Sequence, residues 1–154
     1  MLTAKHYESI GRLAHASNAV EDLIQAHTQL MLGIREWSVI DLVVGYQWTI
    51  GSKVTFFRDM LTALKGDHPS LKTQIEQVLL LLGKAKTLFN ERNTSVHGRV
   101  RTDPMTKKIW LDGRQNSLDC DTLEALTPKF DELYEKLEGA SAEVYWKLLE
   151  IRQP

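Results

Sequence analysis

Residues 71–92, LKTQIEQVLLLLGKAKTLFNER, predict one long helix with a continuous apolar face. Apolar side chains recur at the three- and four-residue steps of an α-helix. They are Leu71, Ile75, Val78, Leu79, Leu82, Ala85 and Phe89. Ser70 precedes the stretch and is a suitable N-cap. With its neighbours, this helix predicts an all-α, antiparallel helical bundle.

Four further helices are expected around it. Residues 3–32 carry a helical apolar stripe that ends near Gly33. Residues 37–44 form a short apolar run, which fits a buried helix or a strand. The next helix begins at Gly51-Ser52, with Ser52 as its N-cap, and lasts to about Gly66. The last extends from Asp121 or Thr122 to Ile151.

The residues after Gly98 lose the helical period. Two short runs, 99–101 and 108–111, flank a segment that contains Asp103-Pro104. This pattern favours a short β-hairpin or an extended arm. Such an arm would bring three cationic side chains close to His97 as candidate substrate-binding groups: Arg99, Arg101 and Lys107.

Length and cysteine usage favour a single domain, residues 1–154, in a reducing compartment such as the cytoplasm. A chain of 154 residues can bury its own core. Cys120 is the only cysteine, so no disulfide framework is expected. The longest apolar run, Val78 to Leu82, is far too short for a membrane span, and the N-terminus lacks a hydrophobic leader.

The net charge of −1 argues against a protein that coats nucleic acid indiscriminately. The charges are unevenly distributed, however. Residues 84–114 contain eight basic and three acidic side chains, whereas residues 118–150 contain nine acidic and three basic ones. The basic segment fits a phosphate-binding surface, and a solvated loop beside an acidic helix explains it equally well.

The segment Arg92-Asn93-Thr94-Ser95-Val96-His97 lies at the end of the long apolar helix. On a continuous helix, Asn93 and His97 share a face, whereas Arg92 lies about 140° around the axis from His97. Arg92 and His97 can therefore converge only if the helix breaks near Gly98 or if a second copy of the chain contributes its own pair.

This segment resembles the Arg-x4-6-His signature of HEPN domains, in which the second residue is typically polar, as Asn93 is here. An all-helical chain of this length with the motif after a long helix also matches that family. The resemblance implies a metal-independent ribonuclease that works as a homodimer, without a cofactor, in defence or stress response. It equally allows a non-catalytic member that binds a nucleotide or a partner, and a protein inhibitor of the toxin–antitoxin kind.

The residue types suit RNA cleavage without a metal. Histidine titrates near neutral pH, and arginine offers a planar fork that matches phosphate oxygens. In this interpretation His97 is the general acid and base, Arg92 holds the phosphate, and Asn93 orients one of them. Thr94 and Ser95 are weaker candidates.

A purely structural explanation is the alternative. Helices often end with Asn or His in the last turn and Gly beyond it, so Asn93, His97 and Gly98 could simply terminate the helix. In that case the protein would be a structural helical dimer, and these residues would serve only to end the helix. Metal binding is not expected, because the five histidines are scattered and no Cys/His pair has ligand spacing.

Overall fold

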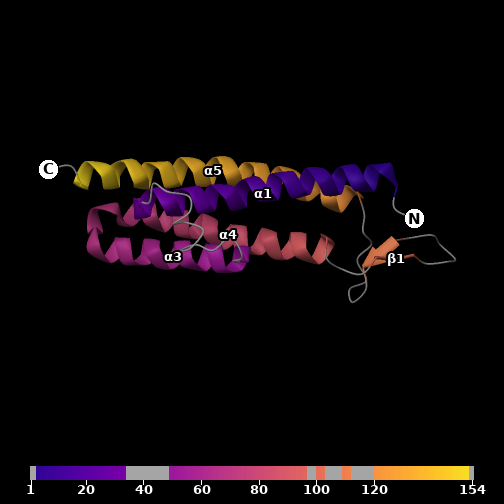
Figure 1. Cartoon of the computed structure of the whole chain (residues 1–154), viewed down its shortest axis with the longest axis horizontal. Coiled ribbons are helices and arrows are strands. Elements are labelled where there is room, and N and C mark those ends of the chain that lie inside the picture. The colour runs from indigo at the N-terminus through magenta and orange to yellow at the C-terminus, as the bar shows by residue number, and fades with distance from the viewer. Residues whose placement is uncertain (1–2, 34–48, 97–99, 103–108, 112–119, 153–154) are drawn as a thin grey trace.

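The computed structural model describes residues 3–33, 49–96, 100–102, 109–111 and 120–152. Within these residues the structure has four long helices: α1 (Ala4–Leu32), α3 (Ile50–Asp67), α4 (Lys72–Val96) and α5 (Cys120–Arg152). A 3-10 turn, η2 (Pro69–Leu71), joins α3 to α4. The predicted helical fold class is confirmed (Figure 1). The expected helix at 37–44 lies outside the described residues.

Two short strands, β1 (Val100–Thr102) and β2 (Ile109–Leu111), pair antiparallel, with Arg101 opposite Trp110. They lie in the segment between α4 and α5 for which the sequence predicted a hairpin or an extended arm. The residues that link them, 103–108, lie outside the described part of the chain. The strands lie beyond the end of α4, at the end of the bundle where α1 and α5 begin (Figure 1).

Among the described helices, α3, α4 and α5 alternate in direction, whereas α1 and α5 point the same way. Ser9 near the start of α1 bonds Glu124 near the start of α5, and Arg152 at the end of α5 bonds the Met31 carbonyl at the end of α1. Helices α1 and α5 therefore run parallel, while α4 runs antiparallel to both (Figure 1). The α3–α4 and α4–α5 pairs are antiparallel as predicted, and α1 runs parallel to α3 and α5 (Figure 1). The expected helix at 37–44, which would stand between α1 and α3 in the chain, lies outside the described residues, so the direction of the whole bundle stays a prediction.

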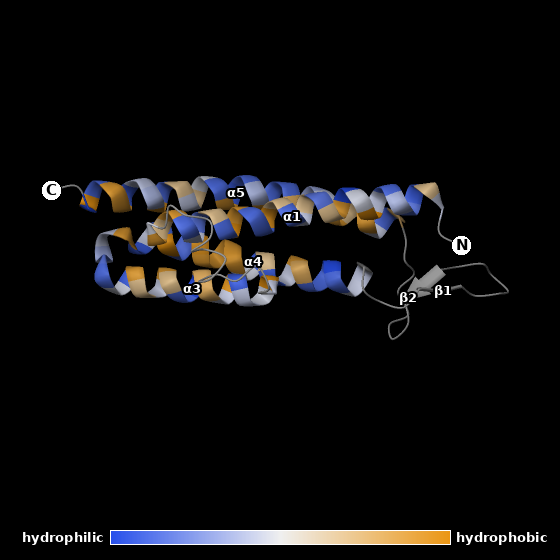
Figure 2. Ribbon diagram, in the orientation of Figure 1, coloured by the Kyte–Doolittle hydropathy of each residue, from blue (hydrophilic) through white to orange (hydrophobic). Residues whose placement is uncertain are grey.

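The core lies between the helices, as the apolar stripes predicted. All the stripe positions of α4 from Leu71 to Phe89 are buried, except Leu79, which packs partly buried against the core. On the other helices the largest fully buried side chains include Leu13, Phe57 and Phe130. Figure 2 shows apolar residues gathered where the helices adjoin. No helix in the described part of the chain has the length and apolar character needed to cross a membrane.

The helix ends follow local chemistry, with two corrections. Gly33 ends α1 in the left-handed region, at φ 70°, where glycine is favoured. Helix α3 starts one residue before Gly51, and its N-cap is Thr49, whose side chain accepts from the Ser52 backbone N–H. The prediction of Ser52 as N-cap was therefore wrong, since a threonine three residues earlier performs the same role. Ser70 lies inside η2, because Pro69 begins a 3-10 turn there, and not at an α-helix N-cap.

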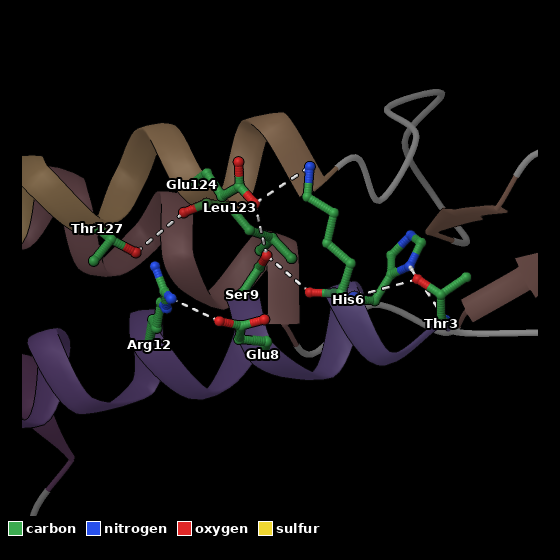
Figure 3. A network of polar contacts seen from close by, with 9 residues as sticks. Thr3, His6, Glu8, Ser9, Arg12, Leu123, Glu124 and Thr127 are labelled. Carbon is green, nitrogen blue, oxygen red and sulfur yellow. Dashed lines mark hydrogen bonds and ion pairs between the residues drawn. The ribbon is translucent and has the colours of Figure 1, made fainter.

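Polar contacts join α1 to α5 at the end of the bundle where α4 ends (Figure 3). The Ser9 hydroxyl lies 2.9 Å from the Lys5 carbonyl oxygen and 3.2 Å from the Glu124 carboxylate. Lys5 also lies 3.5 Å from Glu124, and this ion pair raises the pKa of Lys5. Thr3 and His6 form a capping box that begins α1. These contacts hold the starts of α1 and α5 in register.

Candidate functional site

Helix α4 carries the predicted motif on its last turns. It remains helical through Val96, four residues past the predicted end near Arg92. Of the predicted catalytic residues, Arg92 and Asn93 are described, and His97 lies outside the described residues. Among the substrate-binding candidates, Arg99 and Lys107 also lie outside, and Arg101 is described only as backbone in β1.

Arg92 continues the buried stripe of α4. Phe89 is buried three residues earlier, so Arg92 falls on the same helix face, and its side chain is partly buried. The Phe89 ring packs edge-on against Phe130 of α5, with ring centroids 5.2 Å apart. A guanidinium therefore occupies the place where the next apolar core residue would be expected.

The position of α3 explains why the core stops there. Lys65 of α3 pairs with Glu76 of α4 at 3.6 Å, and the two helices are antiparallel neighbours. Because both helices have the same rise per residue, Ile50, the first residue of α3, lies opposite about Glu91 of α4. Helix α4 extends past that point in Figure 1. Arg92 thus lies where α4 loses its cover by α3.

The hydrogen bonding of Arg92 is incomplete. Its Nη1 donates to the Asn93 Oδ1 at 3.1 Å. Its Nε is buried and has no hydrogen-bond partner among the described residues. An N–H left unsatisfied in a buried position costs about 1–3 kcal/mol, so this donor favours an added acceptor. Asn93 orients one edge of the guanidinium and leaves Nε available.

A groove of about 800 Å³ runs between the end of α4 and the start of α5, and Asn93 lines it. We call it the motif groove. Its walls combine polar and apolar surface: Thr87, Asn90, Glu91, Asn93, Thr94 and Ser95 on α4, with Thr122, Ala125, Leu126 and Lys129 on α5. Lys129 lies 3.9 Å from Glu91 across the groove. Such walls suit a polar ligand with several acceptors and donors.

Thr94 and Ser95 already use their hydroxyl hydrogens within the helix. Thr94 Oγ1 donates to the Asn90 carbonyl at 2.9 Å, and Ser95 Oγ donates to the Glu91 carbonyl at 3.0 Å. Their oxygens can still accept from a ligand. Neither hydroxyl hydrogen is therefore left for a ligand, and the sequence had indicated both residues only as weaker candidates.

The helix-end explanation fits Arg92 poorly. The last turn of α4 contains no basic residue, so Arg92 lies before the carbonyls with which a terminal cation would interact. Asn93 is within the helix, and its side-chain oxygen accepts from Arg92. For His97 the helix-end explanation stays open, since α4 is helical up to the preceding residue.

Sequence reasoning missed the contribution of α5 to this site. Thr122 and Lys129 line the motif groove but lie in the acidic segment that the charge count set apart from the motif. The repeat of Leu126 and Phe130 could have indicated it. A buried stripe through those two residues leaves Thr122 and Lys129 beside it, facing the same neighbouring helix.

Among the described residues, no group of three or more His, Cys, Asp or Glu side chains is arranged to hold a metal ion. Comparisons with protein-family models, with curated proteins and with solved structures gave no match to this chain. The family resemblance of residues 92–97 therefore stays a prediction.

Proposed function

We propose that this protein is a HEPN-like, metal-independent endoribonuclease, in which Arg92 binds the scissile phosphate and His97 transfers the protons. The observation that carries the proposal is the half-buried guanidinium of Arg92, with its Nε buried and unpaired among the described residues. A phosphate offers that donor the acceptor it lacks, and arginine–phosphate bonds are charge-assisted and strong.

The chemistry follows from these two groups. Neutral His97 removes the proton of a ribose 2′-OH, and the 2′ oxygen attacks the adjacent phosphorus. The bond from phosphorus to the 5′ oxygen breaks, and a protonated histidine returns a proton to that oxygen. The products are a 2′,3′-cyclic phosphate and a 5′-OH end. Arg92 stabilises the charge that builds up on the phosphate oxygens in the transition state.

A homodimer supplies the geometry. Because α4 stays helical through Val96, a residue at position 97 on that helix would lie about 140° from Arg92. A second copy with its α4 end alongside would let Arg92 of one chain meet His97 of the other. Asn93 keeps the guanidinium oriented for that meeting.

A binding module without catalysis is the second candidate, and the motif groove favours it. The described groove walls include amides, hydroxyls and a lysine–glutamate pair, which can hold a ligand through hydrogen bonds and charge. In that case Arg92 and the groove would hold a nucleotide or a partner group, and His97 would only contribute charge.

Cleavage of a mixed single-stranded RNA in EDTA separates the two candidates. The ribonuclease proposal predicts products with 2′,3′-cyclic phosphate ends and no cleavage of the DNA analogue, which lacks the attacking hydroxyl. Arg92→Ala and His97→Ala should each lower the cleavage rate by about a hundredfold or more. Binding of RNA without any cleavage would favour the binding module.

Matched controls guard against contaminating nucleases and general charge effects. Arg58→Ala removes an exposed arginine from α3, and His15→Ala removes an exposed histidine from α1. Both should cleave as the wild type does. Full activity in an Arg92→Ala/His97→Ala double variant, or cleavage that stops in EDTA, would contradict the proposal.

A further inference from the structure

A second hollow lies on the same α4–α5 surface, next to the motif groove. Its volume is about 300 Å³, and it shares Thr87 and Lys129 with the groove. We call it the lysine–leucine hollow. It is lined by Leu81, Lys84 and Leu88 of α4 and by Lys129, Leu133 and Lys136 of α5, with Glu132 beside them. Its floor is apolar and its rim is cationic.

An exposed leucine lies on α4 near the hollow, outside its lining. Leu80 is 64% exposed and lies four residues before Lys84, so the two share a helix face. A single exposed leucine is ordinary on a protein surface. The hollow itself combines an apolar floor with a polar rim, an arrangement that is typical of interaction sites.

The rim carries an excess of positive charge. Lys84, Lys129 and Lys136 face a single carboxylate in the hollow, Glu132. A hydrogen bond from Lys136 holds the pKa of Glu132 below its usual range, and the charge of Lys84 acts in the same direction. Glu132 is thus paired with Lys136, and Lys129 is paired with Glu91 of the neighbouring motif groove, so that Lys84 is the cation in excess among the described residues of the rim.

We propose that the lysine–leucine hollow binds an acidic amphipathic helix of a partner protein. Apolar side chains of that helix would enter between Leu81, Leu88 and Leu133, and its flanking carboxylates would meet the three lysines. A groove between two packed helices is the usual seat of such a segment. From Leu81 to Ser95 the two hollows offer about 21 Å of α4, the length of a four-turn helix.

Charge and surface type favour a protein over a single-stranded nucleic acid here. Single strands bind proteins largely by stacking bases on aromatic side chains. The described residues that line the lysine–leucine hollow include leucines and no aromatic residue. Leucine floors with lysine rims are complementary to leucines flanked by Asp and Glu.

The test is a selection of helical peptides against the full chain. The probe is a phage-displayed library of helices about 14 residues long, with randomised side chains. Recovered peptides are synthesised, and their dissociation constants are measured by fluorescence anisotropy. The proposal predicts apolar residues at helical spacing flanked by Asp and Glu. Lys84→Glu and Lys136→Glu should each weaken binding by about tenfold or more, and Leu80→Ser by severalfold.

Two substitutions elsewhere serve as matched controls. Lys147→Glu reverses a lysine of α5 that pairs with Glu143 outside the hollow, and Leu30→Ser removes an exposed leucine of α1. Both should leave peptide binding unchanged. Circular dichroism checks folding of each variant, and Lys84→Gln replaces Lys84→Glu if the latter does not fold.

Three results would overturn the proposal. The first is recovered peptides that lack acidic residues or bind the lysine variants as tightly as the wild type. The second is a 12-nucleotide RNA that, unlike the peptides, loses affinity on Lys84→Glu. The third is self-association of the wild-type chain that Lys84→Glu abolishes, which would make a second copy the occupant.

Discussion

The two ends of the bundle use the same helix, α4, in different ways. Where α3 covers it, α4 buries Ile75, Val78 and Leu82 completely or nearly so. Past the start of α3, the same face presents Arg92, with a buried donor that lacks a partner among the described residues. One end is thus built for stability and the other carries an unsatisfied group. That difference supports our proposal that the arginine end binds a ligand.

The largest expected effect lies at the covered end. Phe57 of α3 is fully buried in the core, and Phe57→Ala should lower the free energy of unfolding by about 3–5 kcal/mol, through lost burial and a cavity. Urea denaturation measures it, with Thr55→Ala, an exposed position of the same helix, as control. A loss below about 1 kcal/mol would mean that α3 is not part of one cooperative core.

The ion pair that joins α1 to α3 should give the next largest effect. Lys53 is 7% exposed and donates to Glu21 at 2.7 Å and to Gln25 at 3.1 Å. Glu21→Gln leaves a buried ammonium without its carboxylate, and should cost about 1–3 kcal/mol. Lys53→Met should cost less, because Glu21 is more accessible and can be hydrated. The reverse order in denaturation experiments would contradict this assignment.

His27 should make stability depend on pH. It is buried on α1, and burial lowers its pKa, against a weaker opposing effect of Glu138. The unfolded chain therefore binds the proton first, so stability falls as pH drops below about 6.5 until the folded pKa is reached. Within that window the contribution changes by at most about 1.4 kcal/mol per pH unit.

His27→Leu should remove this part of the pH dependence, whereas His15→Gln, at an exposed histidine, should keep it. Melting temperatures of the three proteins between pH 7.5 and 5 measure the difference. Parallel pH profiles for wild type and His27→Leu would show that His27 is not the group responsible.

The smallest expected effect is at Arg92 itself. Arg92→Ala should leave the free energy of unfolding unchanged or raise it by a few tenths of a kcal/mol, since it removes a buried donor that has no partner in the described part of the chain. In the proposed dimer the gain should be larger at low salt, where two guanidiniums repel unscreened. Clear destabilisation that salt does not alter would favour a structural role for the arginine.

The described helices could be predicted from the sequence because their apolar residues recur with a regular helical period. The stripe from Leu71 to Phe89 predicted both the helix and its buried face. The direction of each helix was harder to predict, since the parallel pairing of α1 and α5 is visible only in contacts between the two helices. The motif at residues 92–97 could be recognised from the sequence alone. The burial of Arg92 Nε and the groove with Lys129 depend on packing between helices, which a single sequence does not contain.

Binding of an uncleavable RNA tests the central claim that Arg92 serves a phosphate. A 2′-O-methyl oligonucleotide lacks the attacking hydroxyl, so its affinity reports binding without cleavage. The account predicts that Arg92→Ala weakens binding by about tenfold or more and flattens its salt dependence, whereas Arg58→Ala, at an exposed arginine of α3, changes the affinity far less. Equal affinity and salt dependence for the wild type and Arg92→Ala would contradict it.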